Sequence, residues 1–299
     1  MRTVSDVRPV MVQCPEITLS GYAIAPAQEP ARGLILALHG GGSAPGYWDC
    51  PVDGGRLSLM KLAAELGYHV LAIDRPGYAA SEHFDPARLG LQDQVGFLFD
   101  ALESWCRALG FDGPTFVIGH SVGGKLALLM AADPRASRLT AVDALGVPIE
   151  FAGDGVGSEI QSWESAGTHI PFVNAEFHRT ICFGRDGSFS AEALAYDRTI
   201  GRPMPVAEYH QAIAMPGKWP TILPNVRIPV QVTMAEDETM QRVGPEMASR
   251  AEHYLRNSVY ARVAEQKAAG HNASLHHVGR AYHLRALAFF EECIALGQG

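Results

Sequence analysis

The chain has 299 residues, of which 47% are hydrophobic and 19% are charged, and it carries a formal net charge of -8. This length and composition allow one large buried core and are typical of a globular, soluble protein. The acidic balance, without clusters of basic residues, argues against binding to nucleic acid or to anionic membranes.

The sequence indicates neither a membrane segment nor a metal or disulfide framework. No run of 18 or more apolar residues occurs, and the N-terminal stretch lacks the continuous apolar segment of a signal peptide. We therefore expect a cytoplasmic protein without membrane insertion. The five cysteines are scattered without a C-x-x-C pair, and histidines and carboxylates form no compact ligand set. We therefore expect no metal and no cofactor.

Short apolar runs alternate with amphipathic segments in the first part of the chain. Residues 16–27 predict antiparallel strands at one edge of a sheet. The apolar runs at 33–40 and 69–77 end in glycine or in a polar turn, as buried parallel strands usually do. Between them, residues 57–67 predict a helix, and residues 91–110 predict a longer amphipathic helix.

The same alternation continues further along the chain. The predicted elements of this second part are strands at 114–119, 139–148, 228–236 and 258–266, and helices at 122–134 and 274–296. Repeated strand and helix units of this kind imply a mainly parallel sheet with helices on both of its faces.

Residues 149–226 interrupt the alternation, because they contain glycines, prolines and aromatic residues but no clear strand. A segment of this length is more plausibly a small helical subdomain than a loose loop. Ligands of open parallel sheets bind beyond the carboxyl ends of the strands, where such an insertion would cover them. We therefore predict a core formed by residues 1–148 and 227–299, and a helical lid or cap at 149–226.

Ser121 is the candidate nucleophile. It lies at the centre of "GHSVG", residues 119–123, between the predicted strand at 114–119 and the predicted helix at 122–134. The motif G-x-S-x-G alone is short enough to occur by chance, so its context decides. A sharp turn between strand and helix lets the serine project above the sheet, and the flanking glycines relieve the crowding of such a turn.

A serine nucleophile of this type needs donors for the oxyanion that forms when it attacks a carbonyl. The backbone N–H of Val122, at the start of the predicted helix, is one candidate, aided by the helix dipole. The stretch "LHGGGS" after the strand at 33–40 can bring backbone amides close to a carbonyl oxygen. We take Gly41 as the second donor, with Gly42 as the next candidate.

His271 is the candidate base among twelve histidines. It lies in "AAGHNAS", a loop of small residues between the last predicted strand and the C-terminal helix, although a polar loop residue with no catalytic role would fit there equally. The acid that orients it is expected after the strand at 228–236, where Glu236, Asp237 and Glu238 adjoin. The residues alone do not decide which of these three carboxylates is the acid.

The chain resembles the α/β-hydrolase fold superfamily of serine hydrolases in "LALHGGG", "AIDRPGYAAS", "VIGHSVGG", "PVQVTMAEDE" and "AAGHN". The resemblance implies the order serine, acid, histidine, and a helical lid inserted before the acid-bearing strand. It also implies that the acid lies nine places after Pro229, which is Glu238, although the family usually has aspartate there and glycine in place of Ala235. "GYWD" and "VQVTMAE" are loosely similar to hydrolases of actinobacterial secondary metabolism.

The expected reaction is hydrolysis of an ester or thioester of a fairly apolar small molecule. Ser121 would attack the carbonyl, His271 would take and return its proton, and Glu238 would steady the imidazolium. A serine at this position disfavours the dehalogenases and epoxide hydrolases of this fold, which use aspartate. The expected pocket residues, most of which could equally pack within the lid, are Gly42, Phe172, Phe177, Met204, Met215 and Trp219.

Two other classes of function fit the same residues. A carbon-carbon bond hydrolase, a lyase or a cyclase on this scaffold would keep Ser121 and His271. A ligand-sensing receptor related to hydrolases would bind its ligand without rapid turnover. The sequence does not indicate the oligomeric state.

Overall fold

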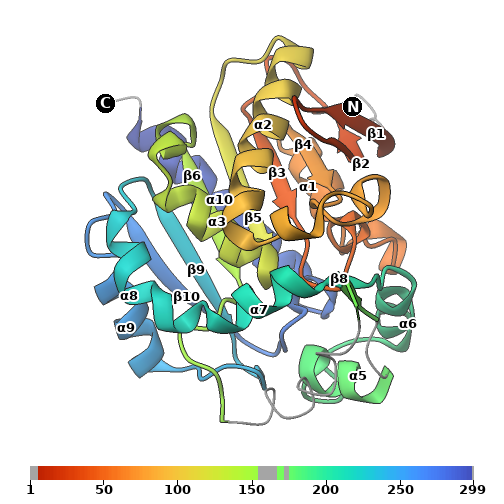
Figure 1. Ribbon diagram of the computed structural model, residues 1–299, viewed down its shortest axis with the longest axis vertical. Coiled ribbons are helices and arrows are strands. Elements are labelled where there is room, and N and C mark those ends of the chain that lie inside the picture. Colours follow the sequence, from red (N-terminus) through yellow and green to blue (C-terminus); the bar gives the residue numbers. More distant parts are fainter. Residues whose placement is uncertain (1–5, 154–166, 172–174, 298–299) are drawn as a thin grey trace.

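One eight-stranded sheet organises the chain, which a computed structural model describes for residues 6–153, 167–171 and 175–297. The strands are β1 (Arg8–Gln13), β2 (Thr18–Ile24), β3 (Gly33–Leu38), β4 (Tyr68–Ile73), β5 (Thr115–His120), β6 (Ala141–Leu145), β9 (Val230–Ala235) and β10 (Ala261–Gln266). Their order across the sheet is β1-β2-β4-β3-β5-β6-β9-β10. Only β1 and β2 run antiparallel to their neighbours, and all other pairs are parallel (Figure 1).

Helices cover both faces of this sheet, as predicted. The main helices are α1 (Leu59–Glu65), α2 (Leu91–Leu109), α3 (Val122–Ala132), α9 (Pro245–Tyr254) and α10 (Gly279–Leu296). Buried residues of α2, α3 and α9 belong to one hydrophobic cluster, whereas those of α1 and α10 belong to a second. The predicted fold class, a mainly parallel sheet between two helical layers, is therefore confirmed.

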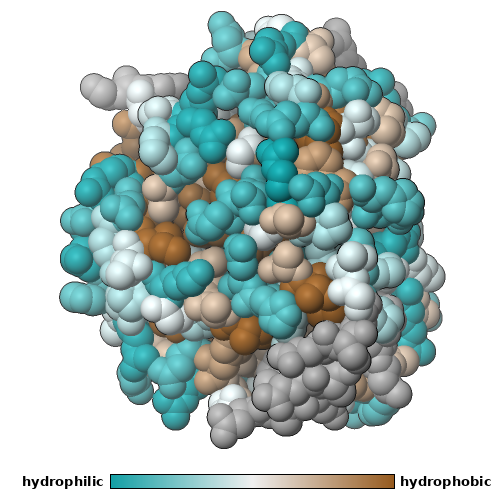
Figure 2. Space-filling model, viewed as in Figure 1, coloured by the Kyte–Doolittle hydropathy of each residue, from teal (hydrophilic) through white to brown (hydrophobic). Residues whose placement is uncertain are grey.

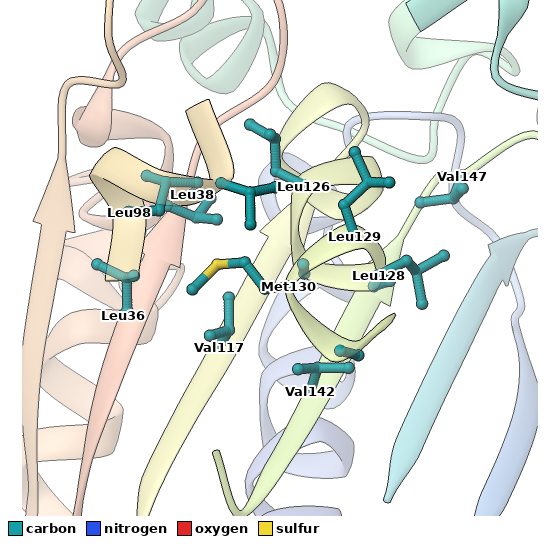
Figure 3. Close-up of a cluster of buried hydrophobic side chains, with 14 of the residues drawn as sticks. Leu36, Leu38, Leu98, Val117, Leu126, Leu128, Leu129, Met130, Val142 and Val147 are labelled. Carbon is teal, nitrogen blue, oxygen red and sulfur yellow. The ribbon is translucent and has the colours of Figure 1, made fainter. Parts of the chain in front are cut away.

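Strand β3 shows why the central strands read as continuous apolar runs. Leu34, Leu36 and Leu38 belong to the cluster that contains α2 and α3, whereas Ile35 and Ala37 belong to the cluster on the opposite face. Successive side chains of a strand point to opposite faces, so a strand covered on both sides needs apolar residues at every position. Figure 3 shows α3 packed through Leu126 and Met130 close to Leu36, Leu38 and Val117 of the sheet.

Two element boundaries differ from the sequence prediction. Strand β1 precedes the predicted antiparallel stretch and is mostly exposed, so its apolar pattern is weak. Helix α10 begins at Gly279 rather than near residue 274, because a 3₁₀ turn at Ala273–Leu275 comes first. A Cβ atom at Gly279 would lie 2.3 Å from the carbonyl oxygen of Ser274, so this close approach requires glycine.

The segment between β6 and β9 is mainly helical in its described part. Its elements are β7 (His169–Ile170), α5 (Ala175–Phe183), α6 (Ala191–Thr199), β8 (Met204–Pro205), α7 (Val206–Ala214) and α8 (Trp219–Ile222). Strands β7 and β8 form a short antiparallel pair that the sequence did not indicate. Residues 154–166 and 172–174 of the predicted lid lie outside the described residues. The division of the chain into core and lid stays a prediction.

The surface drawn in Figure 2 is mostly hydrophilic, and hydrophobic residues reach it in small groups, several of them in the lower half of the view. Within the described part of the chain, no helix combines the length and apolar character that crossing a bilayer requires.

Candidate active site

Ser121 sits on a strained turn between β5 and α3. Its φ of 54° and ψ of -112° lie in a region that residues other than glycine rarely adopt. The turn is held on both sides, because the Ser121 N–H donates to the Leu145 carbonyl at 2.8 Å and the Ser121 carbonyl accepts from the Lys125 N–H at 2.9 Å. The side chain is thereby presented at the carboxyl end of the central strands.

The glycines that flank Ser121 are required by close backbone approaches. A Cβ atom at Gly119 would lie 2.2 Å from the carbonyl oxygen of Gly123, and one at Gly123 would lie 2.2 Å from that of Leu38. Both distances are far below van der Waals contact. The motif G-x-S-x-G is therefore a steric requirement of this turn.

His271 and Glu238 form a buried pair. The Nδ1–H of His271 donates to Oε2 of Glu238 at 2.7 Å, and the two side chains are 3% and 0% exposed. Glu238 also accepts from the Met240 N–H at 3.2 Å and from the side-chain amide of Gln241 at 3.1 Å. This carboxylate is therefore held on three sides, and it fixes the orientation of the imidazole ring.

The three adjacent carboxylates have separate partners. Glu236 accepts from the Ala268 N–H at 2.9 Å and pairs with Lys267 at 3.1 Å. Asp237 lies 3.3 Å from the guanidinium of Arg185. Glu238 is thus the member of the acidic turn that contacts the candidate base.

Ser121 and His271 line one cavity of about 1150 Å³, counted together with its opening to solvent. His120, the residue before Ser121, also contacts His271, because its Nε2–H donates to the His271 carbonyl at 3.0 Å. The His120 ring stacks on Tyr47 with 4.4 Å between ring centroids, so His120 braces the turn.

Most of the remaining predicted site residues line the same cavity. Those are the oxyanion candidates Gly41 and Val122 and the pocket candidates Gly42, Phe177 and Met204. Phe172 lies outside the described residues.

Met215 and Trp219 require a correction, because neither lines the cavity that holds Ser121. Both are fully buried in the hydrophobic cluster that contains α2 and α3, and the Trp219 indole N–H donates to the Pro148 carbonyl at 2.8 Å. Their apolar character serves the packing of the inserted segment against the core, not contact with a substrate.

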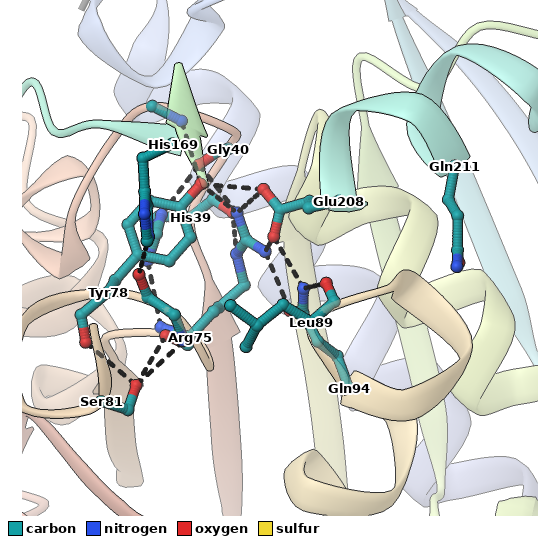
Figure 4. Close-up of polar contacts among 12 residues, drawn as sticks. His39, Gly40, Arg75, Tyr78, Ser81, Leu89, Gln94, His169, Glu208 and Gln211 are labelled. Carbon is teal, nitrogen blue, oxygen red and sulfur yellow. Dashed lines mark hydrogen bonds and ion pairs between the residues drawn. The ribbon is translucent and has the colours of Figure 1, made fainter. Parts of the chain in front are cut away.

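A buried polar network supports the glycine loop after β3 (Figure 4). The guanidinium of Arg75, at the end of β4, donates to the His39 carbonyl at 2.9 Å and to the Gly40 carbonyl at 3.1 Å. Arg75 also forms an ion pair with Glu208 of α7, and both side chains are 0% exposed. The Tyr78 hydroxyl donates to Glu208 at 2.8 Å and accepts from the Gly42 N–H at 3.2 Å.

The Glu208→Ala substitution tests how strongly this network supports the fold. It would leave the charge of Arg75 buried without its partner, so we expect the free energy of unfolding to fall by about 3–5 kcal/mol. Denaturant unfolding measures the change. Glu192→Ala, which removes an exposed glutamate from α6, is the control and is expected to stay close to wild type. Equal stability of the two variants would show that the pair contributes nothing.

Sequence reasoning missed two groups of polar residues at this cavity. The imidazole of His178 on α5 lies 2.5 Å from Asp197 of α6, which also accepts from the Asn272 side chain at 3.0 Å, and all three residues line the cavity. Lys125 of α3 lines it as well. A single lysine in the otherwise apolar "VGGKLALLMAA" was a signal that the sequence offered. In the described part of the chain, no three ligand-type side chains are grouped to hold a metal.

Comparison with known proteins matches residues 35–283 to the model of the alpha/beta hydrolase family. The lysophosphatidylserine lipase ABHD12 of Macaca fascicularis is 31% identical over 99 residues, which are 32% of this chain and 22% of that protein. The chain thus matches less than a quarter of that curated relative's length.

Two solved structures share the fold over almost the whole chain. A soluble variant of monoglyceride lipase from Saccharomyces cerevisiae has a TM-score of 0.69 at 17% identity, covering 98% of this chain and 97% of that one. A thermophilic esterase from Thermogutta terrifontis has a TM-score of 0.67 at 16% identity, covering 96% and 99%.

Proposed function

Because this chain belongs to the alpha/beta hydrolase family, we propose that it is a serine hydrolase that cleaves an ester or thioester of a fairly apolar small molecule. The observation that carries the proposal is the buried pair of His271 and Glu238 at the cavity that Ser121 also lines. A nucleophile on a strained turn, a base and an orienting acid are the three parts that acyl transfer to water needs.

In the proposed mechanism, Ser121 attacks the carbonyl carbon of the bound substrate and His271 removes the serine proton. The oxyanion of the tetrahedral intermediate accepts hydrogen bonds from the backbone N–H groups of Val122 and Gly41. His271 then gives the proton to the leaving alcohol or thiol, while Glu238 stabilises the imidazolium. Water, activated by His271, hydrolyses the acyl-enzyme in the same way.

The walls of the cavity support an apolar acyl group. Val122, Phe151, Ile170 and Ile181 line the cavity together with Met204, and they come from both the core and the inserted segment. Apolar walls with a few placed polar groups are typical of small-molecule sites. We propose that residues 149–226 act as a lid or cap over this cavity, since α5, β8 and α7 all contribute lining residues.

The proposal is tested with p-nitrophenyl esters of short and long acyl chains and with acyl thioesters. We expect turnover of at least one ester series, with product release in excess of the enzyme. Stoichiometric binding without turnover would contradict the proposal and favour a ligand-sensing receptor. Reaction at carbon-carbon bonds, without hydrolysis of any ester or thioester, would favour the lyase, cyclase or carbon-carbon hydrolase alternatives. A cytoplasmic location stays a prediction.

A further inference from the structure

Lys125 is a buried cation at the candidate active site. It lies four residues after Ser121, in the first turn of α3, whose N-cap residue is Ser121. The residue is only 4% exposed, yet it lines the cavity that holds Ser121 and His271. Lys125 is therefore one of the residues around the space that a substrate would occupy.

The ammonium of Lys125 has no direct contact partner in the described part of the chain, and Glu238 and Glu208 act on it only through longer-range electrostatics. No hydrogen bond or ion pair involves its ammonium, whereas the other buried cation near the site, Arg75, contacts Glu208 and two carbonyls. A buried charge without a contact partner costs free energy, so the presence of a lysine at this buried position requires an explanation. Burial lowers the pKa of Lys125 to about 8, with Glu238 and Glu208 acting in the opposite direction, so the ammonium remains mainly protonated at neutral pH.

A role as counter-charge for Glu238 does not account for Lys125. Glu238 already accepts hydrogen bonds from His271, Met240 and Gln241, and it lies beyond ion-pair distance of Lys125. The other cations at the cavity differ from Lys125, since His178 is paired with Asp197 and Arg202 is exposed and donates to the Thr199 and Gly201 carbonyls. Lys125 is thus the buried cation left for a ligand.

We propose that Lys125 binds a carboxylate carried by the acyl group of the substrate. The inference rests on the proposed function and narrows its substrate class to monoesters or monothioesters of dicarboxylic acids. The acyl chain then runs from Ser121 to Lys125, with its carbonyl at the nucleophile and its carboxylate at the ammonium. The apolar walls contact the methylene groups of this chain, and Lys125 fixes its far end.

The test compares mono-p-nitrophenyl glutarate with p-nitrophenyl pentanoate, which has the same chain length but a methyl group in place of the carboxylate. Lys125→Met keeps the length of the side chain and removes the charge. We expect it to lower the ratio of kcat/KM values, glutarate to pentanoate, by about 10- to 100-fold, mainly through KM. Lys125→Arg is expected to retain part of the preference.

Lys218→Met, which removes an exposed lysine, is the matched control and is expected to leave the ratio unchanged. Equal loss of activity toward both esters in Lys125→Met would identify a positioning or folding role and overturn the proposal. An unchanged ratio would overturn it as well.

A binding measurement separates this inference from the proposed function. In the Ser121→Ala protein, calorimetric titration with monomethyl glutarate is expected to give binding that Lys125→Met weakens by at least about 10-fold. Methyl pentanoate is expected to bind more weakly and without dependence on Lys125. Binding of both compounds with equal affinity would contradict a carboxylate site, whereas an absence of ester hydrolysis would contradict only the proposed function.

Discussion

Ser121→Ala is expected to lower kcat/KM for ester hydrolysis by about 10⁴-fold or more. The substitution removes the oxygen that forms the acyl-enzyme, and the oxyanion donors alone supply only a small remaining rate. The cavity, the His271–Glu238 pair and the hydrogen bonds of the turn all involve other atoms, so they are expected to persist. Initial rates with the best p-nitrophenyl ester measure the effect.

The control for Ser121→Ala is Ser249→Ala, which changes an exposed serine of α9 far along the chain from the motif. It is expected to keep wild-type rates. Thermal unfolding of both variants checks that the fold is retained, because a strained serine at φ 54° stays equally strained as alanine. Retention of more than about a tenth of the activity in a folded Ser121→Ala protein would exclude Ser121 as the nucleophile.

Glu238→Gln is expected to lower kcat by about 10³- to 10⁴-fold, the second largest effect. The glutamine has nearly the same size, so it fits the buried position, but it carries no charge to stabilise the His271 imidazolium. Its amide can also present an N–H to the ring and so select the wrong tautomer of His271. Steady-state kinetics with the same ester measure the loss, which is expected in kcat more than in KM.

Two neighbouring carboxylates provide matched controls for Glu238→Gln. Glu236→Gln and Asp237→Asn make the same chemical change two positions and one position away, where the side chains contact Ala268 and Arg185 instead of His271. Both are expected to stay within a few-fold of wild-type kcat. If kcat fell further in either of these variants than in Glu238→Gln, the role of the acid would be assigned to that residue instead.

The central strands could be predicted from the sequence because their cause is local. A strand such as β3, covered by helices on both faces, needs an apolar residue at nearly every position, and this pattern is visible without the structure. The turn at Ser121 was predictable for the same kind of reason, since the close approaches at Gly119 and Gly123 permit only glycine.

The choice of the acid could not be derived from the residues alone. Glu236, Asp237 and Glu238 are adjacent and similar in chemistry, and the path of the backbone after β9 decides which one meets His271. Resemblance to a family supplied the spacing that favoured Glu238. The pair of Arg75 and Glu208 had no local signal either, because 133 positions separate the two residues.

Apolar residues of the inserted segment were predicted less well because a core and an apolar pocket select the same side chains. Met204 lines the cavity, whereas Met215 lies in the hydrophobic core eleven positions further along. The packing of α7 against α2, and of the 3₁₀ turn at Leu223–Asn225 against α3, distinguishes the two environments. Lys125 shows the opposite case, in which one charged residue within an apolar helix marks a position that packing alone does not explain.

The central claim, that Ser121 is an activated nucleophile, is tested most directly by labelling with a fluorophosphonate probe followed by mass spectrometry of the peptides. We expect one label per chain, located on Ser121, with labelling abolished in Ser121→Ala and strongly slowed in His271→Ala. Labelling of the wild-type protein at another residue, or labelling that persists in Ser121→Ala, would contradict the claim.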